Sequence, residues 1–132
     1  MMLSYAHAGL MCIGFAFLLA GFIVVRFMKG RAWWLKVHRL CGIVGGSCTV
    51  MGFCAVVLDI VLAGGRHLRI LHGYIGVVAV VLAVAAPLLG FMQFRFREHI
   101  RVIRRLHVWS GRITLLLMFV NIILGLSIIG VI

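Results

Sequence analysis

Four of the six histidines are distributed one to each long apolar segment of the chain, near the first residues of that segment. They are His7, His38, His72 and His107. The other two, His67 and His99, fall between segments, where solvation is a sufficient explanation. A neutral imidazole nitrogen is a common ligand for iron, so the four segment-borne histidines are candidate metal ligands. Whether they meet in pairs depends on the elements that carry them.

Four stretches are long enough to cross a membrane as helices, which takes roughly 20 residues each. We predict spans at about residues 4–28, 35–63, 70–93 and 106–131. The chain of 132 residues is 65% apolar and 11% charged, which is more apolar surface than a soluble domain of this size can bury. The predicted fold is all-α, an integral membrane up-down-up-down bundle of four helices that forms a single domain over residues 1–132.

Antiparallel neighbours place the four histidines at two depths. His7 and His72 begin helices that run in one direction, whereas His38 and His107 begin helices that run in the other. In such a bundle the first and third helices are diagonal partners, as are the second and fourth, and a diagonal gap can hold a planar macrocycle. We therefore predict two haems b between diagonal helices, ligated by His7 with His72 and by His38 with His107. The absence of a CxxCH motif excludes covalent attachment, and bis-histidine ligation leaves no open iron position, which favours electron transfer.

A glycine follows three of the histidines by four residues. These glycines are Gly42, Gly76 and Gly111. On a helix each lies on the histidine's face one turn deeper, where the missing side chain would let a porphyrin lie against the backbone. Small residues at this spacing also serve ordinary helix association, which is the alternative interpretation. Four histidines at two matched depths favour haem.

Aromatic and basic side chains accompany the same histidines. Tyr74 and Trp109, two residues after a histidine, are expected to pack near a porphyrin ring. Arg69 and Arg104, three residues before a histidine and nearer the interface, are expected to pair with haem propionates. Arg112 lies deeper in its span, where a cation is costly without a counter-charge, so a propionate is its expected partner too.

The net charge of +11 is concentrated in two turns. Five Lys or Arg residues surround the first connection and five surround the third, whereas the second has two and the termini have none. By the positive-inside rule, the first and third turns are predicted to be cytoplasmic and both termini extracytoplasmic, in the cell membrane. Topology therefore explains the charge, and no nucleic acid partner is expected. Asp59, near the outer end of its span, is expected to have an interfacial role.

Four runs, in this order and spacing, resemble the four-helix core of the cytochrome b561 family over nearly the whole chain. They are His7-Ala-Gly-Leu-Met, Trp33-Trp34-x-x-x-His38, Leu-His72-Gly-Tyr-Ile-Gly and Leu-His107-Val-Trp-Ser-Gly-Arg112. The chain is most similar to the transmembrane part of the DOMON-linked and ferric-reductase-like members. This resemblance implies two non-covalent haems b, the same two ligand pairs and transmembrane electron flow.

The resemblance implies an electron-transfer subunit that takes electrons from a quinol or a cytoplasmic reductant. Its partner would be a multihaem cytochrome, an iron–sulfur protein or a DOMON-type subunit. The alternative is a self-sufficient transmembrane reductase of the ferric-chelate or ascorbate type, but the short predicted turns offer little surface for a substrate and favour the subunit. We expect neither flanking helices nor a DOMON domain, which indicates a minimal prokaryotic member. A homo-oligomer is a further alternative for the quaternary structure.

Overall fold

Over the residues that the structure describes (2–65, 68, 70–128 and 130), this computed structural model consists of four long helices and one short 3₁₀ helix. The elements are α1 (Met2–Phe27), α2 (Trp34–Leu62), α3 (Leu71–Arg95), η1 (Arg97–His99) and α4 (Ile100–Ile128). Each of the four long helices is long and apolar enough to cross a membrane. The prediction of an all-α membrane bundle of four helices is confirmed.

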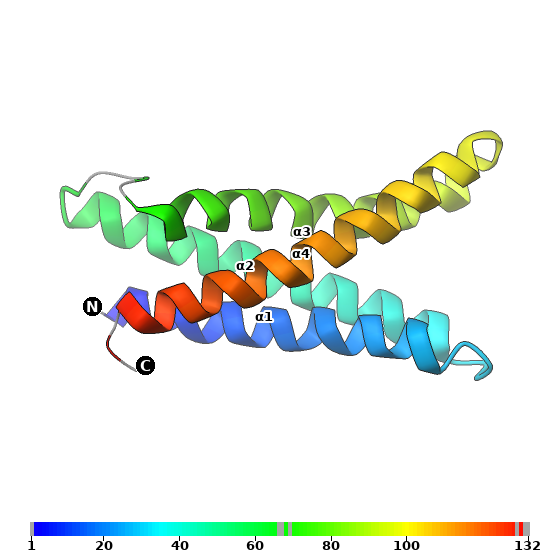
Figure 1. The fold of residues 1–132 in the computed structure, drawn as a ribbon, viewed down its shortest axis with the longest axis horizontal. Coiled ribbons are helices and arrows are strands. Elements are labelled where there is room, and N and C mark those ends of the chain that lie inside the picture. The colour runs from blue at the N-terminus through cyan, green and yellow to red at the C-terminus, as the bar shows by residue number, and fades with distance from the viewer. Residues whose placement is uncertain (1, 66–67, 69, 129, 131–132) are drawn as a thin grey trace.

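Successive helices run antiparallel. The N-terminus, the C-terminus and the α2–α3 connection lie at one end of the bundle, and the α1–α2 and α3–α4 turns lie at the other (Figure 1). α1 packs along α2, and α3 packs along α4, so the molecule consists of two hairpins that meet more sparsely through α2–α3 and α1–α4. Among the described residues, α1 does not approach α3 closely, nor α2 approach α4. These are therefore the diagonal pairs.

Small residues hold the first hairpin together. Gly14 on α1 and Gly45 on α2 bring the two backbones so close that a Cβ on Gly45 would lie 3.0 Å from the carbonyl oxygen of Gly14. Thr49 is fully buried at the same contact, and its hydroxyl donates a hydrogen bond to the Gly45 carbonyl at 2.8 Å. Because lipid is as apolar as a side chain, membrane helices associate through this kind of close packing.

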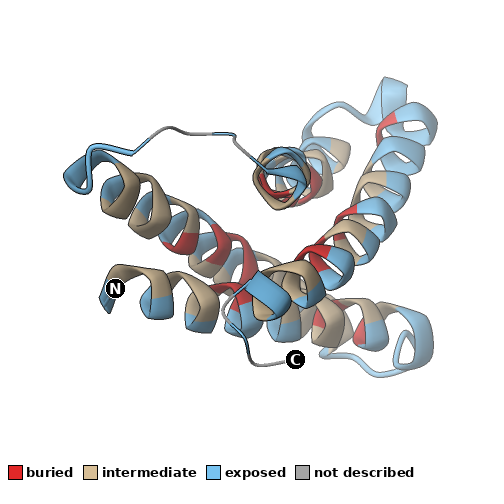
Figure 2. Cartoon of the chain, turned by 60° about the vertical axis from the view of Figure 1, so that its left-hand side comes forward, coloured by how far each residue is buried: buried red, intermediate tan, exposed pale blue. Residues whose placement is uncertain are grey.

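Most apolar side chains face outward. The buried residues gather on the inward faces where the helices cross, while the outer faces are exposed along their whole length (Figure 2). Leu40, Leu88 and Leu116 are exposed leucines on three different helices. In a protein that spans a bilayer, lipid tails cover such a surface.

The helix bounds follow the predicted spans with one exception. α4 begins at Ile100, whereas the predicted span begins at residue 106. Arg101, Arg104 and Arg105 belong to this helical extension. Hydropathy marks the part of a helix that lipid covers, and arginine is a good helix former outside it, so the helix continues beyond the predicted span.

Candidate functional site

The structure brings the four segment-borne histidines together as two pairs. The ring centres of His7 on α1 and His72 on α3 are 6.2 Å apart, with their planes at 87°. Those of His38 on α2 and His107 on α4 are 5.9 Å apart, with their planes at 85°. Each pair joins diagonal helices, one from each hairpin. After the orientation predicted from the charges, we call the His7/His72 pair the outer pair and the His38/His107 pair the inner pair.

The spacing within each pair suits a shared metal ion. An imidazole nitrogen binds a metal at about 2 Å, so two imidazoles on opposite sides of one ion have ring centres about 6 Å apart. Both observed separations, 6.2 Å and 5.9 Å, match this distance. Among the described residues no third candidate ligand joins either pair, and two facing imidazoles fit the ligation typical of a haem of the electron-transfer type.

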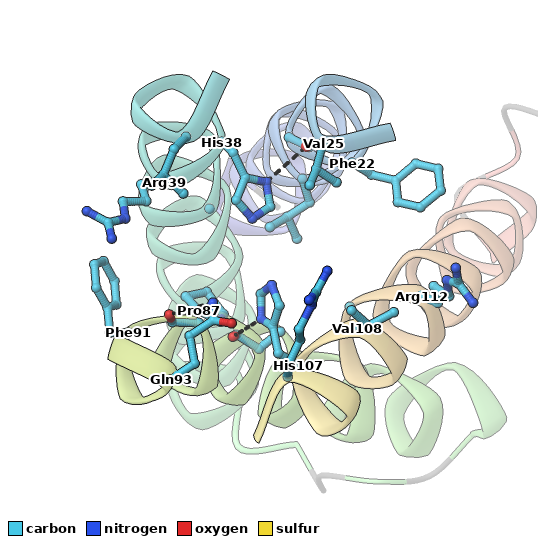
Figure 3. A pocket seen from close by; sticks show the side chains of 18 of the residues that line it. Phe22, Val25, His38, Arg39, Pro87, Phe91, Gln93, His107, Val108 and Arg112 are labelled. Atoms are coloured by element: carbon cyan, nitrogen blue, oxygen red, sulfur yellow. Dashed lines mark hydrogen bonds between the residues drawn. The ribbon is translucent and has the colours of Figure 1, made fainter. Parts of the chain in front are cut away.

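Every one of these histidines is anchored through Nδ1 to a backbone carbonyl on the other helix of its own hairpin. The acceptors are Gly52 for His7 at 2.9 Å, Gly21 for His38 at 3.0 Å, Asn121 for His72 at 3.1 Å and Ala86 for His107 at 2.7 Å. A carbonyl oxygen only accepts, so Nδ1 must carry the proton and Nε2 is the free nitrogen. The dashed lines in Figure 3 mark the two anchors of the inner pair.

The acceptor carbonyls lie at a constant sequence distance from the histidines, a pattern that the sequence-based prediction missed. On every helix the acceptor carbonyl lies 14 residues after that helix's own histidine: 7 and 21, 38 and 52, 72 and 86, 107 and 121. Fourteen helical residues rise about 21 Å, so each helix supplies an imidazole at one level and a carbonyl at the other. The signal available in the sequence is a Gly or Ala 14 positions after three of the four histidines.

Two further glycines, also missed, make room for the imidazole rings. A Cβ on Gly90 would lie 3.1 Å from Cε1 of His107, and a Cβ on Gly125 would lie 3.0 Å from Cε1 of His72. Each glycine is four residues after the acceptor in its helix, so it lies one turn closer to the C-terminus of that helix than the carbonyl that the ring approaches. A larger side chain there would push the ring away from its acceptor.

A cavity of about 450 Å³ lies at the inner pair and is lined by residues from all four helices. The rings of His38 and His107 face each other across it (Figure 3). Gly42 and Gly111 also line it, and a Cβ on either glycine would meet no atom within 4 Å. The space above these two predicted glycines is therefore open, as a flat macrocycle requires.

Basic side chains surround this cavity. Arg104 and Arg112 are among its lining residues, as are Arg26, Lys29 and Arg39. The Arg39 guanidinium reaches from α2 to α3, where its Cζ lies 4.5 Å from the ring centre of Phe94. The charge and the open space together fit a group that carries carboxylates.

Three other predicted site residues, Gly76, Tyr74 and Trp109, are not among the residues that line the inner cavity. Gly76 is buried, and a Cβ there would lie 3.0 Å from Nδ2 of Asn121, so a side-chain amide fills the space above it. Tyr74 and Trp109 are more than half exposed, and Trp109 is not among the residues that line the inner cavity. It lies instead beneath Arg112, whose Cζ is 5.5 Å from its ring centre. Arg69 lies outside the described residues.

The outer end also contains a polar contact between α1 and α2. The Ser4 hydroxyl donates a hydrogen bond to the Asp59 carboxylate. Ser4 lies three residues before His7, so this contact is close to the level of the outer pair. Of the two histidines between segments, His99 is exposed beside Glu98, at 3.6 Å, and His67 lies outside the described residues.

Comparison with known proteins gives one family. A family model described as "Eukaryotic cytochrome b561" matches residues 6–130, which include all four paired histidines. No curated protein and no solved structure matches the chain. A prokaryotic origin stays a prediction. The family match agrees with the resemblance drawn from the sequence: the chain belongs to the cytochrome b561 family, whose multi-pass membrane proteins bind haem b and transfer electrons across the bilayer.

Proposed function

We propose that this protein holds two haems b, one at each histidine pair, and passes electrons between a donor on one side of the membrane and a redox partner on the other. The observation that carries the proposal is the existence of two equivalent histidine pairs, with ring centres 6.2 Å and 5.9 Å apart, on diagonal helices. When bound, each haem supplies a one-electron Fe(III)/Fe(II) couple.

The residues of each pair have two tasks, binding and orientation. The Nε2 atoms are the proposed iron ligands, and the hydrogen bonds from Nδ1 fix the tautomer and the ring orientation. An acceptor on Nδ1 also raises the basicity of Nε2, which strengthens its bond to iron. Because each pair would supply both protein ligands of an iron, the pairs suit outer-sphere electron transfer and not the binding of a gas.

The two histidine pairs lie at different levels along the helices. Their levels are separated by 14 residues on every helix, about 21 Å, which is most of a hydrocarbon core of about 30 Å. One haem would then lie in each leaflet. The inner pair shares its end of the bundle with the two basic turns, and we propose that this end is cytoplasmic.

Arginines at the inner cavity are the proposed propionate partners. Arg104 and Arg112 line the cavity that also contains His107, and a guanidinium binds a carboxylate in a bidentate geometry. We propose a quinol or a cytoplasmic reductant as the donor. On the other side we propose a multihaem, iron–sulfur or DOMON-type protein as the acceptor.

Haem counting tests the proposal. We expect the purified protein to give a reduced-minus-oxidised b-type spectrum and two haems per chain in a pyridine haemochrome assay. His72→Ala should lose the outer haem and keep a low-spin inner haem, and His38→Ala should do the reverse. His99→Ala, in an exposed turn, is the matched control and should keep both. Two low-spin haems in either paired-histidine variant would contradict the ligand assignment.

A further inference from the structure

Five basic residues line the inner cavity, and they differ in how far each is buried. They are Arg26, Lys29, Arg39, Arg104 and Arg112. Arg39 is half-buried, whereas the other four are exposed. Withdrawing a guanidinium from water inside a membrane is costly unless its charge has a partner. Of the five residues, Arg39 therefore has the greatest need of a counter-charge.

Aromatic rings hold the Arg39 guanidinium at the wall of the cavity. Its Cζ lies 4.5 Å from the ring centre of Phe94 and 5.9 Å from that of Phe91, and both rings line the cavity. In Figure 3 Arg39 extends from α2 toward Phe91 of α3, on the side of the histidine pair opposite Arg112. A guanidinium that lies over a ring keeps the N–H groups at its edge free to bind a carboxylate in a bidentate geometry.

Two of the exposed arginines stack on rings that lie outside the cavity. The Cζ of Arg26 is 5.3 Å from the ring centre of Phe27, and the Cζ of Arg112 is 5.5 Å from that of Trp109. Neither Phe27 nor Trp109 lines the cavity. Of the three stacked arginines, Arg39 is thus the one whose aromatic contacts keep it at the cavity wall.

No side-chain carboxylate of the protein is placed to neutralise Arg39. The chain contains two acidic residues, Asp59 and Glu98. Asp59 accepts a hydrogen bond from Ser4 at the outer end of α2. Glu98 is exposed in η1, 3.6 Å from His99, and does not line the cavity. The counter-charge for Arg39 must therefore come from a bound group that carries an anion.

We propose that Arg39 binds a propionate of the inner haem, with Phe91 and Phe94 fixing the guanidinium for this contact. The inference rests on the two-haem function proposed above. It adds a ligand from α2 to the site and leaves the second propionate to the arginines of α4. The sequence pattern around the histidines did not indicate Arg39, because the contact depends on rings contributed by α3.

The depth of the Arg39 contact suits a propionate. Phe91 and Phe94 follow Ala86 on α3 by five and eight residues, so they begin roughly 7–12 Å nearer the inner end than the carbonyl that holds His107. α2 begins at the inner end, and helix side chains lean toward the N-terminus, so Arg39 is directed the same way. A propionate extends from the edge of the macrocycle, so its carboxylate also lies away from the iron.

The test compares haem b with its dimethyl ester, in which both propionates are neutral. The full chain with His72→Ala, in which we expect only the inner site to bind, is reconstituted with each compound, and the dissociation constants are measured in the Soret band. Arg39→Met in this background should weaken the binding of haem b about tenfold, the effect of losing one charge-assisted contact, and should change the binding of the ester little.

Three further variants refine the comparison. Arg26→Met is the matched control, because it removes an arginine of the same cavity that stacks on an outside ring, and it should leave the preference for haem b unchanged. Arg39→Lys should retain only part of the preference, since lysine binds a carboxylate as a point charge. Phe94→Leu keeps the charge but removes the ring 4.5 Å away, and it should reduce the preference severalfold.

Equal weakening of haem b and ester binding in Arg39→Met, or no weakening of either, would overturn the inference. If that variant does not accumulate, Arg39→Gln is measured in the same way and is decided by the same two results. The haem count separates this failure from failure of the proposed function: a wild-type chain with fewer than two haems contradicts the two-haem function itself.

Discussion

A methyl group added at Gly90 should press on one of the proposed haem ligands. A Cβ at this position of α3 would come 3.1 Å from Cε1 and 3.3 Å from Nδ1 of His107, so the ring must move by a few tenths of an ångström. The ring is not free to move, because its Nδ1 donates to the Ala86 carbonyl at 2.7 Å. We therefore predict that Gly90→Ala stretches or breaks this hydrogen bond and weakens the binding of the inner haem.

The size of the effect on haem binding follows from the hydrogen bond between His107 and the Ala86 carbonyl. A hydrogen bond of this kind contributes a net free energy of about 0.5–1.5 kcal/mol. Since about 1.4 kcal/mol corresponds to a factor of ten, the inner haem should dissociate about twofold to tenfold faster. Alanine also favours the helix over glycine by up to about 1 kcal/mol, which opposes any loss of fold stability. Haem dissociation is therefore the informative measurement, and thermal unfolding is not.

The assay is transfer of haem to excess apomyoglobin, followed in the Soret band, and we expect the two proposed haems to leave as separate phases. Gly9→Ala is the matched control, because a Cβ there would meet no atom within 4 Å. Gly125→Ala should accelerate the other phase, since its Cβ would lie 3.0 Å from Cε1 of His72. Equal dissociation of the inner haem from Gly90→Ala and Gly9→Ala would refute the reasoning.

Three further predictions concern the cavity, the topology and the transfer itself. Gly111→Leu should fill the open space beside His107 and abolish binding of the inner haem. Two haems per chain in this variant, by pyridine haemochrome, would contradict the expectation that a porphyrin lies against Gly111. Arg31→Cys, in the first basic turn, should react with an impermeant thiol reagent only in inverted vesicles, and labelling in intact cells would reverse the orientation. Proteoliposomes loaded with a reductant should reduce an impermeant external acceptor, and the His38→Ala, His107→Ala double variant should stop this flow; undiminished transfer would contradict a two-haem path.

The sequence alone was sufficient for the architecture and for which histidines meet. Hydropathy locates four spans because lipid demands long uninterrupted apolar helices, and short connections force these helices to alternate in direction. Alternation then places His7 with His72 and His38 with His107, at opposite ends of the bundle. The two ring pairs in the structure lie where this reasoning expects them.

Only the tertiary structure decided which backbone and side-chain groups surround those histidines. The acceptor carbonyls, the close approach of Gly90 and Gly125, and the amide of Asn121 over Gly76 all depend on how far each helix is rotated about its axis. The outward position of Tyr74 and Trp109 depends on it too. In a soluble helix an apolar stripe reveals this rotation, but here the lipid-facing and inward-facing surfaces are both apolar. The pattern of hydropathy therefore cannot encode the rotation, and the packing of the two helices within each hairpin determines it.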